Sequence, residues 1–114
     1  MNFERERQNV GQGWQVLLEN LHENLLSTIG EHHVVQIKEK FGGLRYYYMY
    51  GHGGQDELDM QTARALVRQT ENLSFEICET CGDPGFTKPY GGWLKTLCPR
   101  HHDLRQMGGD WRRT

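Results

Sequence analysis

Residues 78–102 read CETCGDPGFTKPYGGWLKTLCPRHH and contain all three cysteines of the chain. Cys78 and Cys81 form a C-x2-C pair, and Cys98 is followed three residues later by a pair of histidines. Three cysteine sulfurs and one imidazole nitrogen are a common tetrahedral ligand set for structural zinc. The stretch therefore predicts one structural zinc ion, bound by the three cysteines and one histidine.

The residues between the cysteines predict a zinc knuckle, a hairpin and a helix. Gly82 follows the second sulfur, where a tight turn often needs a residue that tolerates positive φ. Residues 86–88 and 93–97 are expected to form short strands on either side of a Pro-Tyr-Gly-Gly turn. Pro99 suits the first position of a helix, because its missing N–H does no harm there. Together these elements predict a treble-clef-like zinc module.

Two histidines compete for the fourth ligand position. Cys98 and His101 would lie one turn apart on the same helix face, so the i, i+3 separation favours His101. His102 stays open as the alternative. Two other interpretations compete with a zinc site: three unrelated buried thiols, and a thioredoxin-like redox pair. A redox pair is expected to follow a buried strand and to precede a long helix, and this one does neither.

Composition and cysteine usage predict one small domain in a reducing cytoplasm. The chain has 114 residues, 36% of them hydrophobic, and its mean hydropathy is −0.78. A small core of this kind would gain folding energy from a bound metal. An odd number of cysteines at metal-like spacing indicates a reducing compartment. There is no apolar run of about 18 residues and no apolar signal region at the charged N-terminus, so we expect no membrane interaction and no secretion.

The sequence before the cysteines predicts an α-β-β-α body. Apolar residues at helical spacing predict a helix over 14–29, after an N-terminal segment, 1–12, that we expect to be frayed. Strands are predicted over 34–41 and 44–50, with a turn at Gly42-Gly43, and a helix capped by Asp56 should follow. The prediction is an α+β fold in a single domain, 1–114, with three parts: body 14–77, zinc module 78–107 and tail 108–114.

Charge and aromatic side chains point to candidate binding residues. Residues 1–87 carry seven basic and thirteen acidic side chains, whereas residues 88–114 carry six and two. The basic C-terminal lobe could contact phosphates or an acidic protein. The tyrosine-rich second strand could stack on bases, or its rings could simply supply packing area. The candidate contacts are Arg45, Tyr47, Lys88, Lys95, Arg100, Arg105, Trp111, Arg112 and Arg113.

Three motifs, QIKEKFGGLRYYY, ICETCGDPG and GGWLKTLCPRH, resemble a set of small bacterial and bacteriophage proteins. Members of this set share an IKEKFGGLR hairpin and a later C-x-x-C-G, G-W and T-L-C cluster. The resemblance covers roughly residues 14–102. It implies a metal site and a bacterial or phage-encoded origin, and it implies nothing about catalysis.

Three functions fit these observations. We favour a non-enzymatic binding protein that docks on another protein, as a phage or mobile-element inhibitor or adaptor. The alternative is nucleic-acid binding through the basic C-terminal lobe. The third is an HNH-like nuclease, because LCPRHH resembles the closing segment of those enzymes and would place His102 at their last catalytic histidine.

The chain lacks the histidine that an HNH nuclease uses as its general base. HNH enzymes need a histidine near the end of the first strand of the hairpin, where this chain has Phe86-Thr87-Lys88. A closed shell of three cysteines and one histidine also leaves no open position for a hydrolytic water. We therefore predict no enzymatic activity and no small-molecule cofactor other than one zinc ion.

Overall fold

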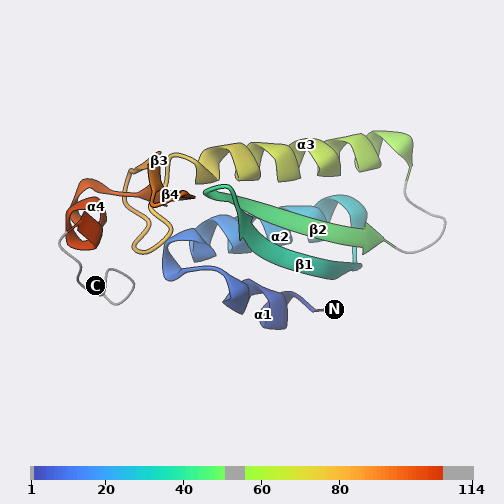
Figure 1. The fold of residues 1–114 in the computed structure, drawn as a ribbon. Coiled ribbons are helices and arrows are strands. Elements are labelled where there is room, and N and C mark those ends of the chain that lie inside the picture. The colour runs from blue at the N-terminus through green and yellow to red at the C-terminus, as the bar shows by residue number, and fades with distance from the viewer. Residues whose placement is uncertain (1, 51–55, 107–114) are drawn as a thin grey trace.

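The computed structural model describes residues 2–50 and 56–106 of the chain. The predicted tail, with Trp111, Arg112 and Arg113, lies outside the described residues. Within them, no helix is long and apolar enough to cross a membrane. The elements follow one another along the chain (Figure 1) as α1 (Phe3–Glu6), η1 (Arg7–Asn9), η2 (Gln12–Trp14), α2 (Gln15–Ile29), β1 (His32–Lys40), β2 (Gly43–Tyr50), α3 (Glu57–Ser74), β3 (Phe86–Tyr90), β4 (Trp93–Leu97) and α4 (Pro99–Gln106).

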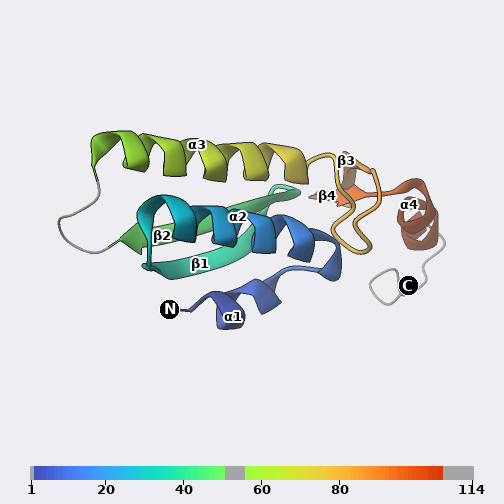
Figure 2. The ribbon, with the colours of Figure 1, turned by 180° about the vertical axis from the view of Figure 1, so that it is seen from behind.

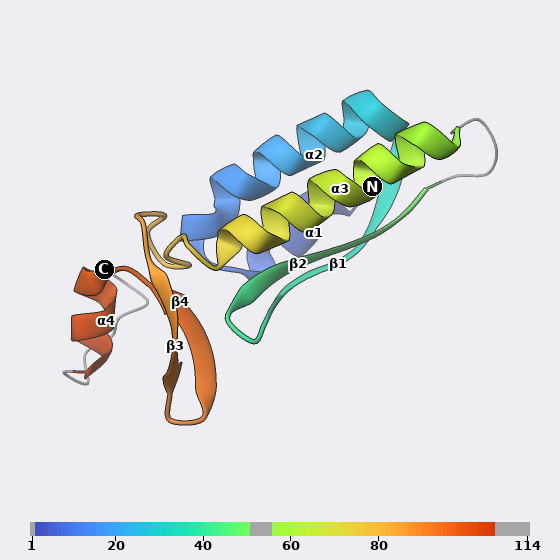
Figure 3. The same cartoon turned by 90° about the horizontal axis from the view of Figure 1, so that it is seen from above.

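The α+β prediction is confirmed: an α-β-β-α body precedes a second hairpin and a short helix. The antiparallel β1–β2 hairpin lies against α2, and α3 runs alongside (Figures 2 and 3). As alternation predicted, Leu44 and Tyr46 lie on the inner face of β2 and are buried. The core between hairpin and helices consists of Phe3, Trp14, Leu18, Leu21, Leu25, Ile29, Val34, Ile37, Leu44, Tyr46, Ala63 and Val67.

The first hairpin differs from its prediction in two places. A β-bulge between Val34 and Gln36 interrupts strict alternation, so that Val34 and Ile37 both face the core. The two-residue turn consists of Phe41 and Gly42, one residue earlier than predicted, with φ angles of 56° and 87°. Two successive positive φ angles are typical of the type I′ turn, which matches the twist of paired strands.

Helix α3 protects the free edge of β2. The Leu44 N–H donates to Ser74 Oγ at 2.8 Å, and the Tyr46 N–H donates to the Glu71 carboxylate at 3.0 Å. Side chains of the helix thus occupy the positions that a third strand would fill. An exposed strand edge invites pairing with another chain, and these contacts close the edge to such pairing at Leu44 and Tyr46.

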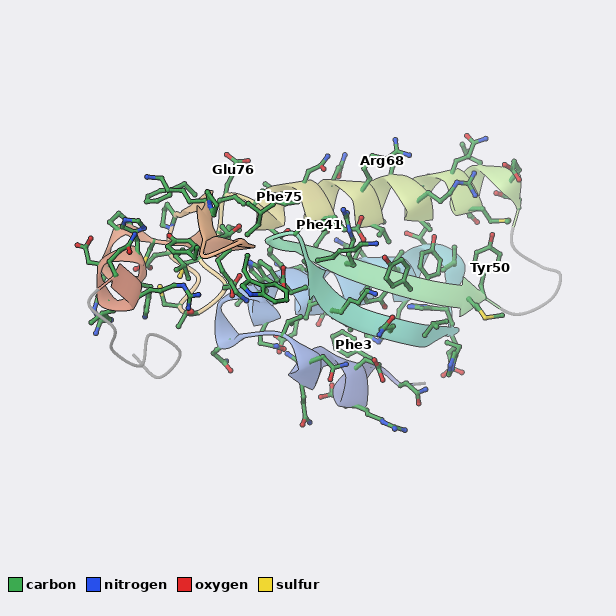
Figure 4. The ribbon with its side chains drawn as sticks, in the orientation of Figure 1. Phe3, Phe41, Tyr50, Arg68, Phe75 and Glu76 are labelled. Carbon is green, nitrogen blue, oxygen red and sulfur yellow. The ribbon has the colours of Figure 1, made fainter. Side chains whose placement is uncertain are left out.

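The N-terminal segment closes the opposite edge, at β1. Glu6 accepts from the Ile37 N–H at 3.4 Å, and Asn9 donates to the Ile37 carbonyl at 3.2 Å. The buried Phe3 ring, labelled in Figure 4, stacks on His22, with the ring centroids 3.9 Å apart. The prediction of a frayed start was therefore wrong, because a single buried ring and two polar side chains anchor a segment with no apolar periodicity.

A polar chain crosses the core between α2 and the first hairpin. Tyr46 Oη lies 3.0 Å from His22 Nδ1 and 2.9 Å from His32 Nε2, and His32 Nδ1 lies 3.0 Å from the Gly30 carbonyl. Because a carbonyl oxygen can only accept, His32 Nδ1 donates to the Gly30 carbonyl. His32 Nε2 therefore accepts from the Tyr46 hydroxyl, and the Tyr46 oxygen accepts from His22 Nδ1. Each of these three hydrogen bonds then has one donor and one acceptor. Burial, followed by the proximity of His32, lowers the pKa of His22 below 6.5.

We expect the free energy of unfolding to fall as the pH drops below 6.5. The unfolded chain then takes up a proton that buried His22 resists, with a limiting slope of about 1.4 kcal/mol per pH unit for one proton. His22→Gln should be less stable at pH 7 but should flatten this dependence between pH 7 and 5, as measured by urea denaturation. His33→Gln, at an exposed position of β1, is the control and should retain the original slope.

Candidate metal centre

The structure brings Cys78, Cys81, Cys98 and His101 together, with their ligand atoms all within 4.8 Å of one another. Cys81 Sγ lies 3.7 Å from Cys98 Sγ, and His101 Nδ1 lies 3.1 Å from Cys98 Sγ and 3.7 Å from Cys78 Sγ. A tetrahedron with metal–sulfur bonds of about 2.3 Å has edges of about 3.8 Å. The four side chains form a group that could hold one metal ion.

Two turns of the backbone aim these ligands. In the knuckle, the Gly82 N–H donates to the Cys78 carbonyl at 2.9 Å, and Gly82 has a φ of 87°, as predicted for this position. The Cys78 N–H donates to the Asp83 carbonyl at 2.8 Å. At the start of α4, the His101 N–H points at Cys98 Sγ at 3.4 Å, so the helix places both ligands on the same face.

The two neighbouring histidines have different surroundings. His101 is fully buried, with Nδ1 directed at the cysteine sulfurs. His102 Nδ1 instead lies 2.6 Å from Tyr90 Oη, and its ring contacts Phe86. His102 therefore packs on the β3–β4 hairpin, and the geometry favours His101 as the fourth ligand.

The cysteine thiols lie so close together that their ionisation is coupled to the presence of a cation. Burial raises the pKa of Cys81 to about 12, and the neighbouring cysteines add to this effect. Burial opposes ionisation of Cys78 as well, but backbone N–H groups of Cys98, Cys81 and Thr80 outweigh it and lower the pKa of the Cys78 thiol. Adjacent thiolates repel one another, and a divalent cation removes that repulsion. The donor set and its spacing therefore fit a thiolate-bound metal.

The N-terminal segment, which sequence reasoning overlooked, contacts the knuckle directly. The Gly13 N–H donates to the Glu79 carbonyl at 3.0 Å, and Trp14 Nε1 donates to the Ile77 carbonyl at 2.9 Å. A Cβ on Gly13 would lie 1.9 Å from the Cys78 carbonyl oxygen. Gly11 and Gly13 have no side chain, which allows this segment, predicted to be frayed, to pack against the backbone of the knuckle.

The remaining candidate residues are dispersed over the described surface. Lys95 is largely buried between Glu79 and Glu39, at 3.6 and 3.9 Å. Arg45 pairs with Glu71 at 3.3 Å, and the Arg105 guanidinium lies over the Tyr90 ring at 5.3 Å. Tyr47, Lys88 and Arg100 are exposed. Lys88 Nζ also lies over the Phe86 ring at 4.5 Å, so three of the described cations of the predicted basic lobe, Lys88, Lys95 and Arg105, are engaged by neighbouring side chains.

Similarity to known proteins does not assign this chain to a family. The chain matches no model of a known protein family, no curated protein and no solved structure. The resemblance to bacterial and phage proteins therefore stays a prediction from the three motifs.

We expect one zinc ion per chain, retained in His102→Ala and lost or strongly weakened in His101→Ala. His101→Ala should weaken zinc binding by more than the roughly 10- to 100-fold typical of losing a supporting residue, whereas His102→Ala should stay within that range. Native mass spectrometry gives the stoichiometry, and competition with a chromogenic chelator gives the affinity. Equal losses in the two variants would contradict the assignment of His101.

Gly13→Ala should destabilise the protein by about 3 kcal/mol, because the new methyl group overlaps the knuckle backbone. It should also weaken zinc binding, because the clash falls on Cys78 and Glu79. Urea denaturation and chelator competition measure the two effects. Gly91→Ala is the control: its Cβ meets open space, so only the strain at a φ of 56° remains. Its zinc affinity should be unchanged.

Proposed function

We propose that this chain is a non-enzymatic binding module, stabilised by one structural zinc ion, that docks on another protein through the tips of its two hairpins. Zinc is the metal favoured by three thiolates and one imidazole in a tetrahedral arrangement. Its binding energy would act as folding energy for the small lobe that contains β3, β4 and α4. With four protein ligands, the metal has no open position for a reacting water, which supports a structural role.

The observation that carries the docking proposal is an apolar surface across two hairpins, which we call the tip patch. It consists of Phe41, Trp93 and Leu94, whose exposed fractions are 65%, 70% and 38%. These side chains line a groove of about 360 Å³. Large aromatic side chains lose favourable burial when they face water, and contiguous examples often mark interaction sites.

The tip patch rests on a fixed contact between the hairpins. Thr96 Oγ1 donates to the Gly42 carbonyl at 2.7 Å, and a Cβ on Gly42 would lie 2.9 Å from Thr87 Cγ2. Figure 3 shows the tip of the β1–β2 hairpin beside the β3–β4 hairpin. The groove is therefore built before a partner arrives, which reduces the entropy lost on binding.

Backbone strain at Phe41 supports the same surface. A bulky residue at a φ of 56° is uncommon, and such strain persists where the surrounding structure enforces it. Phe41, labelled in Figure 4, is nevertheless largely exposed at the hairpin tip. A ring that is held in a strained conformation and left in water is well suited to anchor a partner.

The nucleic-acid alternative has less support among the described residues. Lys95 and Arg105 of the predicted basic lobe are already engaged by carboxylates and by a ring. Phosphate contacts require cations that can reach the backbone of the nucleic acid. We therefore favour a protein partner, with the chain acting as an inhibitor or adaptor.

A photo-crosslinker tests this role. Benzoylphenylalanine placed at position 93, in bacterial cells producing the full chain, should form an adduct with one discrete foreign protein. The same group at Val16, an equally exposed apolar position on α2, should not. The purified partner should then bind the wild-type chain, and Phe41→Ala should weaken that binding by about 2 kcal/mol, or roughly 30-fold, by calorimetry.

Three outcomes would count against protein docking at the tip patch. They are equal adducts from both positions, adducts between copies of this chain alone, and adducts with nucleic acid. Circular dichroism and zinc content of each variant must match the wild type, so that a folding defect is not mistaken for lost binding.

A further inference from the structure

The β1–β2 hairpin has one face that no element of the described ranges covers. Helix α2 lies behind the hairpin in Figure 1 and in front of it in Figure 2, so this helix covers the inner face alone. Helix α3 and the N-terminal segment lie along the two edges. The outer face, which we call the open face, consists of the side chains that alternate with the core residues: His33, Val35, Gln36, Lys38, Lys40, Arg45, Tyr47 and Met49.

Positive charge is concentrated on the open face. Residues 1–87 carry seven basic and thirteen acidic side chains, yet three of the seven, Lys38, Lys40 and Arg45, lie on this face, which has no carboxylate of its own. Among the residues that the structure describes, neither lysine is ion-paired. Arg45 donates to Glu71 through Nη1 at 3.3 Å and keeps further N–H donors. A basic face on an acidic body favours an acidic ligand.

Apolar side chains lie among these cations. Val35, Tyr47 and Met49 have exposed fractions of 44%, 39% and 64%. Val35 belongs to the bulge on β1, and Tyr47 pairs across the hairpin with the adjacent Gln36, so the apolar side chains come from both strands. Neighbouring apolar side chains on a surface often mark a contact site, and methionine adapts readily to a partner's shape. The open face therefore suits a ligand that is both apolar and acidic.

The arrangement of the tyrosines favours a peptide over nucleic-acid bases. Of the four tyrosines in β2, Tyr47 alone lies on the open face, because Tyr46, Tyr48 and Tyr50 share the inner face and contact one another. Lys38 Nζ already lies over the Tyr47 ring at 5.7 Å. Binding of single strands by stacking uses successive accessible rings. One ring with a cation over it is a poor platform for bases.

The occupied strand edges restrict the conformation of such a peptide. Side chains bond to the outward backbone groups of Ile37, Leu44 and Tyr46. A peptide that adds as a third strand needs those backbone groups to be free. A helix satisfies its own backbone hydrogen bonds and packs on a sheet face through side chains alone. The ligand that fits best is therefore helical.

We infer that the open face binds an acidic amphipathic helix of a partner protein. The apolar stripe of that helix packs on Val35, Tyr47 and Met49, and carboxylates on either side of the stripe pair with the three cations. Lys40 also lines the groove of the tip patch, so the two surfaces adjoin. Assigning the helix to the partner of the tip patch rests on the proposed docking function, whereas the open face itself does not.

Nuclear magnetic resonance of the ¹⁵N-labelled full chain tests the site with a synthetic probe. The probe is a stapled helical peptide with leucines along one face and glutamates on both sides of them. It should shift the amide signals of Lys38, Tyr47 and Met49 in a saturable way. The same peptide with glutamine in place of every glutamate should bind about tenfold more weakly, because it loses the ion pairs. Equal binding of the two peptides, or tighter binding of oligothymidylate at the same signals, would overturn the inference.

Variants of the full chain locate the binding. Replacing both lysines, Lys38→Gln with Lys40→Gln, should weaken the probe about tenfold and remove most of the salt dependence of its affinity. Tyr47→Ala should weaken it by a similar factor, and Met49→Ser provides a second test if that variant is poorly folded. Lys88→Gln is the matched control, because Lys88 also lies over a ring but outside the open face. Full affinity in the lysine and the apolar variants would mean that the probe binds elsewhere and would overturn the inference.

Crosslinking separates this site from the proposed function. Benzoylphenylalanine at position 49 in bacterial cells should capture the same protein as position 93, and mass spectrometry should place the adduct in an acidic segment with apolar residues at helical spacing. Val16, with a similar exposed fraction, is again the control. Adducts at position 93 but none at 49, or an adduct outside an acidic segment, would overturn the inference and leave the tip patch standing. Adducts in an acidic segment at 49 but none at 93 would contradict docking at the tip patch and leave the open face standing.

Discussion

The contact between the Cys78–Cys81 knuckle and the rest of the chain is the constraint on which the structure depends. The Cys78–Cys81 turn is held from one side by its own hydrogen bonds, and from the other by the backbone of Gly13, at a distance that excludes any side chain. Glu79 then pairs with β4 through the Thr96 carbonyl at 3.0 Å. A metal bound at the knuckle would thus stabilise three segments at once, since each is ordered by the same few residues.

The contact between the two hairpins determines where the candidate docking surface lies. Because Gly42 of the first hairpin lies against Thr87 and Leu94 of the second, Phe41 and Trp93 meet on one surface. The knuckle also lies beside β4, where the Glu79 N–H donates to the Thr96 carbonyl. Glu79 therefore lies near Lys95, which in turn lies near Glu39. The lobe that carries the candidate metal ligands therefore does more than enlarge a small core. It positions Trp93 and Leu94 beside Phe41, and the proposed docking surface depends on that adjacency.

Stability and recognition make opposite demands in this small fold. Side chains of Glu6, Asn9, Glu71 and Ser74 occupy the free edges of the β1–β2 hairpin at Ile37, Leu44 and Tyr46, which hinders pairing with foreign strands there. Docking by added strands is thereby disfavoured on the first sheet. What stays accessible is side-chain surface, on the open face and at the hairpin tips, where the strain at Phe41 is maintained by the type I′ turn.

The sequence by itself determined the order of the elements and the ligand set, because hydrophobic period, turn residues and cysteine spacing are local signals. Cys78, Cys81, Cys98 and His101 could be chosen from a knuckle pattern and an i, i+3 separation alone. Only the tertiary structure placed Gly13 on the knuckle, the N-terminal segment on β1, and Glu39 beside Glu79. These contacts join residues far apart in the chain, and no local pattern indicates which distant backbone a glycine approaches or which carboxylates share one lysine.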